Sequence, residues 1–272
     1  MKKLIALLLI AVFCLPMFAS CGKMVIVAEK ESAGEEVVTK DDYFSDMDYT
    51  AVDSQAKALM EVKSGTADGC VVDYVCSIGM IGEGTDYADL TVVKNLSFAD
   101  EQYGIAFRKG SSATVARVNA AIKTLLDNGT LATIASKYKL SEQLITAVDT
   151  TATYDENATD AEWEYLQEKG ELIIGITLFA PMNYKDNNNE LTGFETEFSK
   201  AVCEILGLQY KFQEITWSAK ETELSAKNID CIWNGMTINE ERATNMAISV
   251  PYLANKQVLV VKSGNEGKYS AK

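Results

Sequence analysis

Short apolar segments alternate with helix-length segments along much of this 272-residue chain, and few folds accommodate that order. The apolar runs at 24–28, 49–52, 68–73 and 90–94 read as strands, and the segments 31–40 and 54–64 read as helices. Strands separated by helices of about ten residues predict βα units and a mainly parallel sheet, hence an α/β fold. Ligands of such sheets bind beyond the carboxyl ends of the strands, which makes Asp73 a candidate site residue.

The second half of the chain follows a polar interruption. A strand at 102–107 and helices at 111–128 and 131–138 precede residues 141–162, which are polar, acidic and without periodicity, as in a linker. Order then resumes with helices at 163–168 and 193–206 and with strands at 172–176, 210–214, 229–233 and 257–262.

Composition excludes several classes of function. The chain contains no histidine, so a Ser-His-Asp triad, a Cys-His pair, a His-ligated metal and an imidazole base are all excluded. A formal net charge of −14 opposes binding to nucleic acid or to an anionic membrane surface. We expect no metal, and no cofactor fingerprint is present, because Gly79, Gly82 and Gly84 are too loosely spaced for a dinucleotide site.

The first residues resemble a bacterial lipoprotein signal peptide. Lys2 and Lys3 precede an apolar stretch at 4–15, which is short for a membrane span, and small residues lead up to Cys21. The resemblance implies that 1–20 is removed, that Cys21 is lipidated and that 21–23 forms a short tether. The protein would then lie in the cell envelope, at the outer face of the cytoplasmic membrane or in the periplasm, and touch the membrane only through its lipid. An ordinary signal peptide is the alternative.

Four cysteines remain in the body of the chain, Cys70, Cys76, Cys203 and Cys231. No CxxC pair is present, so a zinc ribbon or a redox motif is unsupported. Export permits disulfides, and buried free thiols are the other interpretation.

Several motifs together resemble the amino-acid-binding extracellular solute-binding proteins of ABC importers, family 3, which have a type II periplasmic-binding-protein fold. The opening half of that family is similar to the segments 170–177, 179–181, 193–195 and, above all, Gly-Met-Thr-Ile-Asn-Glu-Glu-Arg at 235–242. The closing half is similar to 67–73, 101–110 and 128–130. The resemblance implies two mainly parallel βα sheets joined by a hinge.

The order of the two halves is reversed, which indicates a circular permutation. We expect a smaller lobe at 24–102, a larger lobe at 103–262 that includes the linker 141–162, and a tail at 263–272. In this arrangement only the crossing near 97–103 joins the lobes covalently. A monomer and a dimer in which two chains exchange lobes are both compatible with it.

A buried zwitterion needs a cation for its carboxylate and an acceptor for its ammonium. Arg242 suits the carboxylate because its planar guanidinium can bind both oxygens. The resemblance implies that Thr237 and Gly235 complete this contact, that Asp73 binds the ammonium, that Trp217 and Phe179 hold the side-chain stem and that Ser32 contributes from the other lobe. Thr177 stands where several relatives carry an acid, so a cationic ligand side chain is less expected. Each residue also has a structural alternative: a solvated helix position for Arg242, a helix cap for Asp73 and core packing for the two aromatic rings.

The resemblance predicts that the protein binds a free, polar L-amino acid between two closing lobes and delivers it to the membrane subunits of an ABC permease. We expect it not to be an enzyme. Two alternatives are a ligand-sensing module for a surface receptor and a dehydratase-like enzyme on the same fold.

Overall fold

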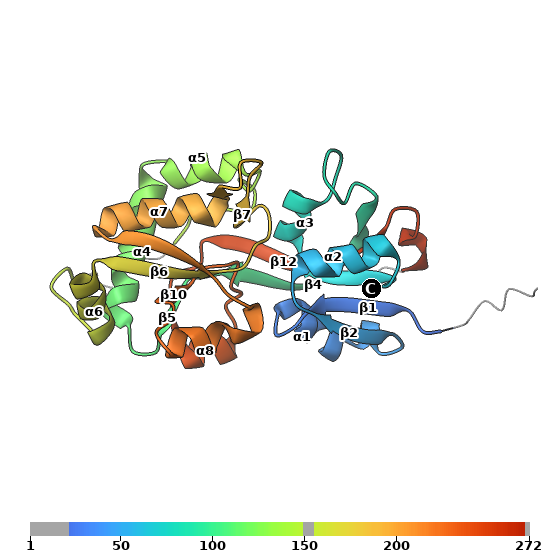
Figure 1. Cartoon of the computed structure of the whole chain (residues 1–272), viewed down its shortest axis with the longest axis horizontal. Coiled ribbons are helices and arrows are strands. Elements are labelled where there is room, and N and C mark those ends of the chain that lie inside the picture. Colours follow the sequence, from blue (N-terminus) through green and yellow to red (C-terminus); the bar gives the residue numbers. More distant parts are fainter. Residues whose placement is uncertain (1–21, 149–154, 270–272) are drawn as a thin grey trace, which may run out of the picture.

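The computed structural model describes residues 22–148 and 155–269, which form two lobes side by side (Figure 1). The expected signal peptide, Cys21, residues 149–154 of the linker and residues 270–272 lie outside the described residues. Two strands, β4 and β12, lie where the lobes meet.

The smaller lobe is built on a five-stranded sheet in the order β2-β1-β3-β12-β4. The first three strands are parallel, and β12 is antiparallel to both β3 and β4. These strands are β1 (Val25–Glu29), β2 (Asp48–Val52), β3 (Gly69–Asp73), β4 (Leu90–Tyr103) and β12 (Leu253–Lys262). The helices of this lobe are α1 (Ala33–Lys40), α2 (Gln55–Ser64) and α3 (Tyr74–Met80).

Helix α2 shows how local sequence sets these elements. The Ser54 hydroxyl accepts a hydrogen bond from the Lys57 amide at 3.1 Å and caps the helix start. Gly65 ends the helix with a φ of +84°, a backbone conformation that favours glycine. The apolar face predicted for this helix is confirmed, since Ala58, Leu59 and Val62 are fully buried.

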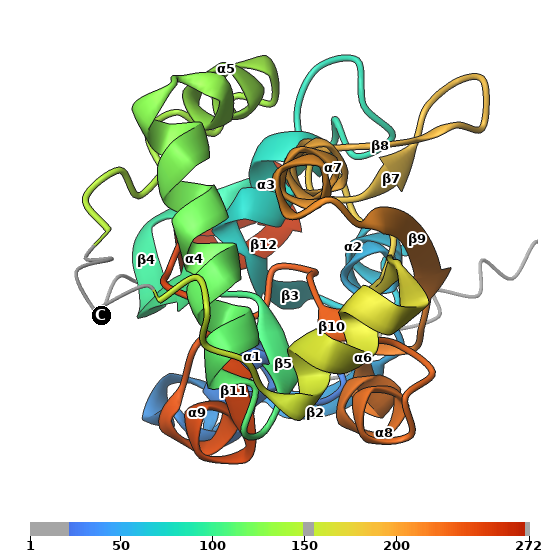
Figure 2. The same ribbon diagram turned by 90° about the vertical axis from the view of Figure 1, so that its left-hand side faces the viewer.

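The larger lobe has a second five-stranded sheet in the order β11-β5-β10-β6-β9. Only β5 runs antiparallel to its neighbours among these strands. They are β5 (Ala106–Arg108), β6 (Glu171–Ile176), β9 (Gln209–Glu214), β10 (Cys231–Ile232) and β11 (Met246–Ile248), and a small hairpin comprises β7 (Tyr184–Lys185) and β8 (Leu191–Thr192). The helices are α4 (Ser112–Asp127), α5 (Thr130–Lys137), α6 (Ala161–Lys169), α7 (Phe194–Leu206), α8 (Lys220–Ser225) and α9 (Glu240–Asn245). Helices α4 and α7 cover one side of the sheet and α8 the other (Figure 2).

The expectation that all of 103–262 belongs to the larger lobe is wrong for the last strand. Strand β12 leaves the larger lobe and lies between β3 and β4 in the sheet of the smaller lobe. Its run Val258–Val261 is at most 1% exposed, and such a continuous apolar run requires a central position with both faces covered. The lobes are therefore joined by two covalent crossings, at 103–106 and at 248–253, instead of the single crossing expected.

Two further expectations change with this boundary. The strand predicted at 102–107 is divided, because the chain passes from one sheet to the other between Tyr103 and Ala106. The expected tail also contributes to the smaller lobe: Tyr269 is 6% exposed and packs with Ile26 and Leu259.

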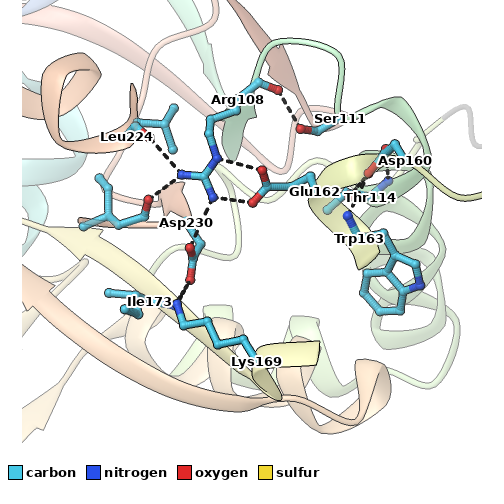
Figure 3. A network of polar contacts seen from close by, with 11 residues as sticks. Arg108, Ser111, Thr114, Asp160, Glu162, Trp163, Lys169, Ile173, Leu224 and Asp230 are labelled. Atoms are coloured by element: carbon cyan, nitrogen blue, oxygen red, sulfur yellow. Dashed lines mark hydrogen bonds and ion pairs between the residues drawn. The ribbon is translucent and has the colours of Figure 1, made fainter. Parts of the chain in front are cut away.

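A buried ionic network attaches the chain after the linker to the larger lobe (Figure 3). Arg108 donates to the Glu162 carboxylate from two of its nitrogens, with Nε at 2.7 Å from Oε2, and to Asp230 Oδ1 at 3.2 Å. Asp230 in turn accepts from Lys169 Nζ at 2.6 Å. Asp160 caps α6 at its first turn. These contacts hold α6 against strands and helices from both sides of the linker.

The four body cysteines are buried free thiols, so the thiol interpretation is confirmed over the disulfide one. Across residues 22–148 and 155–269, no helix has both the length and the apolar character needed to cross a membrane.

Candidate functional site

A small cavity lies where the two lobes meet, and it collects seven of the eight predicted ligand-binding residues. The smaller lobe contributes to its lining Glu29, Ser32, Ala33, Gln55 and Asp73, and the larger lobe contributes Phe179, Trp217, Asn234, Gly235, Thr237 and Arg242. Its free volume is about 10 Å³, which is close to the space of one water molecule. The lobes are therefore closed on each other, and the cavity admits a larger molecule only after they separate.

Arg242 lies in the first turn of α9, where Asn239 caps the helix by accepting from the Arg242 amide at 2.9 Å. Its guanidinium donates to the Thr237 carbonyl at 2.8 Å and to the Glu31 carbonyl at 3.4 Å. The side chain is 7% exposed and forms no ion pair with any carboxylate in the described part of the chain. Because the guanidinium is buried, its pKa is lowered. Such a cation is suited to a carboxylate supplied by a ligand.

The segment before α9 forms the floor of the cavity. Gly235 has a φ of +55°, and a Cβ there would lie 3.0 Å from the Phe179 ring and 3.3 Å from the Tyr103 ring, so glycine is required. The Gly235 amide donates to Glu195 at 2.7 Å. The Thr237 hydroxyl donates to Glu101 at 3.0 Å, which links the floor to the crossing strand β4.

Asp73 lies at the carboxyl end of β3, the sheet edge at which the sequence places it. Although it precedes α3, its side chain makes no capping hydrogen bond, so the helix-cap alternative is wrong. Instead, its carboxylate accepts from Asn255 at 2.8 Å, from Gln257 at 2.5 Å and from Gln55. Burial raises the pKa of Asp73, and these amides act in the opposite direction.

The backbone at Glu31 closes the cleft. Its carbonyl oxygen accepts from Trp217 Nε1 at 3.2 Å, from Lys220 Nζ at 3.4 Å and from Arg242. Glu31 adopts a φ of +58°, where non-glycine residues are uncommon. Three donors of the larger lobe therefore converge on one oxygen of the smaller lobe. Outside this contact, a groove of about 610 Å³ runs between α1 and α8 and includes Lys220 and Arg242 in its lining.

Two of the remaining predicted residues have structural roles as well. Ser32 lines the cavity while its hydroxyl caps α1 by accepting from Glu35. Thr177 stands outside the cavity lining, but its hydroxyl accepts from Asn234 Nδ2 at 2.6 Å, and Asn234 lines the cavity.

Sequence reasoning missed several polar residues of the cleft. They are Glu29, Gln55, Glu101, Lys220, Asn234, Asn255 and Gln257. A signal existed for Glu29, because it ends β1 as Asp73 ends β3. Asn255 and Gln257 carried no such signal, because their contacts depend on the pairing of β12 with β3, which is far away in the sequence.

Known proteins match part of the chain, and the match to a family model lies in its second half. The model of bacterial extracellular solute-binding proteins, family 3, matches residues 172–269. The L-cystine-binding protein TcyJ of Escherichia coli (strain K12) is 32% identical over 103 residues, 38% of this chain and 39% of the relative. A probable amino-acid ABC transporter-binding protein of Haemophilus influenzae is 35% identical over 95 residues, 35% of this chain and 37% of the relative.

A solved structure, an ABC uptake transporter substrate-binding protein from Streptococcus pneumoniae with bound histidine, is 32% identical; the match covers 33% of this chain and 37% of that one, with a TM-score of 0.31. This chain thus spans less than half the length of the curated relatives it matches.

The matched segment contains six of the eight predicted residues, among them Arg242, Thr237 and Trp217. The molecule as a whole has two lobes, each on a mainly parallel sheet, as the type II periplasmic-binding-protein fold requires. Residues 172–269 are therefore similar to the bacterial extracellular solute-binding proteins of family 3.

Proposed function

We propose that the protein binds a free amino acid between its two lobes and delivers it to an ABC permease, as a lipoprotein held at the outside of the cytoplasmic membrane through Cys21. The names of the matched relatives, an L-cystine-binding protein and a probable amino-acid ABC transporter-binding protein, support this class of ligand.

The observation that carries the proposal is the buried guanidinium of Arg242. It has no carboxylate partner within the described residues, and Asp73 lines the same cavity from the opposite lobe. In the proposed complex, Arg242 and Thr237 bind the ligand carboxylate, Asp73 binds the ammonium, and Trp217 and Phe179 pack against the stem of the side chain.

Ligand binding then replaces one set of cleft contacts with another. In the closed form the Glu31 carbonyl accepts hydrogen bonds from Trp217, Lys220 and Arg242, so these donors are not free for a ligand. Opening frees these donors, the ligand carboxylate binds Arg242, and closure brings Asp73 and Ser32 over the ligand.

A thermal-shift screen of the protein from Met24 onward against the twenty L-amino acids tests this function. A ligand at a hundredfold excess over its dissociation constant adds about 2.7 kcal/mol, which corresponds to a rise in melting temperature of about 5–10 °C for a chain of this size. We expect such a rise with one or a few polar amino acids. If a cooperatively melting sample responds to none of them, amino-acid binding is rejected.

Arg242→Ala identifies the site. Leaving the ligand carboxylate without its cation should weaken binding by about 100-fold or more. Arg242→Lys, which keeps the charge but loses the planar fork, should bind with intermediate affinity. Unchanged affinity in Arg242→Ala would show that the ligand binds elsewhere.

We also propose that the chain is a circular permutant whose new ends lie in the smaller lobe, with the linker 141–162 joining the old ends. The order of the motifs supports this proposal. The two covalent crossings favour a monomer, since an exchange of lobes between two chains would have to reroute both.

A further inference from the structure

The charges that line the cavity do not balance those of a simple zwitterion. Two carboxylates, Glu29 and Asp73, face one guanidinium, Arg242. In the proposed complex, Arg242 pairs with the ligand carboxylate and Asp73 with its ammonium. Glu29 is left without a counterpart.

Glu29 is the last residue of β1, and its side chain lies in the cavity lining at 5% exposure. Its Oε1 is buried and has no hydrogen-bond partner within the described chain. Asp73, one strand away in the sheet, differs because three side-chain amides bind its two oxygens. A buried carboxylate without a partner is costly, so it either takes up a proton or gains a cationic partner.

Among residues 22–148 and 155–269, no side chain supplies that partner. The charged and titratable groups that face Glu29 are Asp73 from β3, Cys76 from α3 and Lys220 from α8. Lys220 forms no ion pair with it, and its Nζ instead contacts the Glu31 carbonyl and lies 4.7 Å from the centre of the Trp217 ring. Burial, together with the nearby Asp73, raises the pKa of Glu29 to about 8.

We propose that the ligand is an amino acid with a second cationic group, an ammonium or a guanidinium on its side chain, and that Glu29 binds this group. The inference rests on the proposed function and names its substrate class. Because Thr177 stands where several relatives carry an acid, the sequence made a cationic ligand side chain less expected. The inference reverses that expectation, since the acid that binds the side chain of the ligand is supplied by β1 of the smaller lobe instead.

Proton release accompanies binding in this scheme. At neutral pH the Glu29 carboxyl is largely protonated in the closed, unliganded cleft, since its pKa is about 8. A cationic group placed beside it favours the ionised form, so the carboxyl loses its proton to the buffer as the ligand binds.

Two pairs of ligands of matched shape test the inference by isothermal titration calorimetry. Norleucine has the length of lysine without the ammonium, and citrulline has the shape of arginine without the charge. For at least one pair, we expect the wild-type protein to bind the cationic member about 10- to 100-fold more tightly. Titrations in phosphate and in Tris at pH 7 should show proton release with the cationic member and little with the neutral one.

Glu29→Gln, nearly identical in shape, should abolish both the preference and the proton release. Glu36→Gln is the matched control, because Glu36 lines the outer groove but not the cavity, and it should leave both unchanged.

The inference is overturned if neither cationic ligand is preferred over its neutral partner, or if Glu29→Gln keeps the preference. In either case amino-acid binding itself would still stand. A protein that binds no amino acid at all would instead reject the proposed function. The comparison of ligand pairs on the wild-type protein decides the question even if a variant folds poorly.

Discussion

Three glutamates in and around the cleft, Glu29, Glu101 and Glu195, are buried and form no ion pair with any described lysine or arginine. Burial is the main cause that raises the pKa of Glu29 to about 8 and the pKa values of Glu101 and Glu195 to about 7. The folded protein therefore holds protons that the unfolded chain releases above pH 4.5.

These raised pKa values predict how stability depends on pH. The contribution of each group is complete below pH 4.5 and is lost as pH rises through the pKa of the folded state. We expect the free energy of unfolding, measured by urea denaturation, to fall between pH 5 and pH 8, with a slope of up to about 1.4 kcal/mol per pH unit for each carboxyl that is protonated only in the folded state.

Glu29→Gln should reduce this loss of stability with pH more than the same substitution at Glu101 or Glu195, because the pKa of Glu29 is raised the most. Glu36→Gln, at an exposed carboxylate, should leave the decline as it is. A free energy of unfolding that stays constant or rises from pH 5 to pH 8 would contradict the assignment of these buried acids.

The residues that sequence could identify are those whose role follows from local position. Asp73 ends a strand, and Arg242 ends a recognisable motif in the first turn of a helix, so the sequence alone predicts both as site residues, and both line the cavity. Gln257 and Asn255 bind Asp73 only because β12 pairs with β3 at Gln257 opposite Asp73. No local pattern encodes a register between segments so far apart.

At the scale of elements, the joint between α6 and the rest of the larger lobe depends on buried charge. The side chains of Arg108 and Glu162 are 14% and 6% exposed, and the Arg108 guanidinium also donates to the Leu224 and Ile229 carbonyls at 2.8 and 2.7 Å. Removing one partner of such a buried network leaves the other uncompensated.

Glu162→Ala should therefore lower the free energy of unfolding by about 3–5 kcal/mol. Lys123→Met, which breaks an exposed pair with Asp127, is the control and should cost about 0.5 kcal/mol or less. Both are measured by urea denaturation at one pH. Equal effects of the two variants would mean that the network does not hold α6 in place.

The sequence predicted most helices and strands of both lobes, because amphipathic periods and apolar runs are local signals. The sequence analysis assigned the last strand to the wrong lobe, because an apolar run does not indicate which sheet will bury it. The apolar run at 258–261 predicts burial on both faces, but several sheets can offer that, and only the folded chain selects the gap between β3 and β4.

For the whole molecule, closure requires α3 of the smaller lobe to approach the loop after β6. A Cβ added at Gly79 would overlap the backbone of Pro181 and its Cδ. Backbone offers no side-chain rotation to relieve such an overlap, so the lobes have to separate.

Gly79→Ala should consequently populate the open form. Small-angle scattering should give a larger radius of gyration than for the wild-type protein without ligand, and affinity for the amino acid should fall because fewer molecules can close. Gly267→Ala, where nothing lies within 4 Å of the added carbon, is the control. An unchanged radius of gyration and affinity would show that this contact does not limit closure.

The position of β12 also has a consequence for the order in which the protein is made. A ribosome completes β4 at Tyr103 and reaches β12 only at Leu253, yet the sheet of the smaller lobe needs β12 between β3 and β4. Until then, β3 and β4 lack the neighbour that joins them, and contacts this distant in sequence form slowly. The half of the molecule that is synthesised first is therefore the half that finishes folding last.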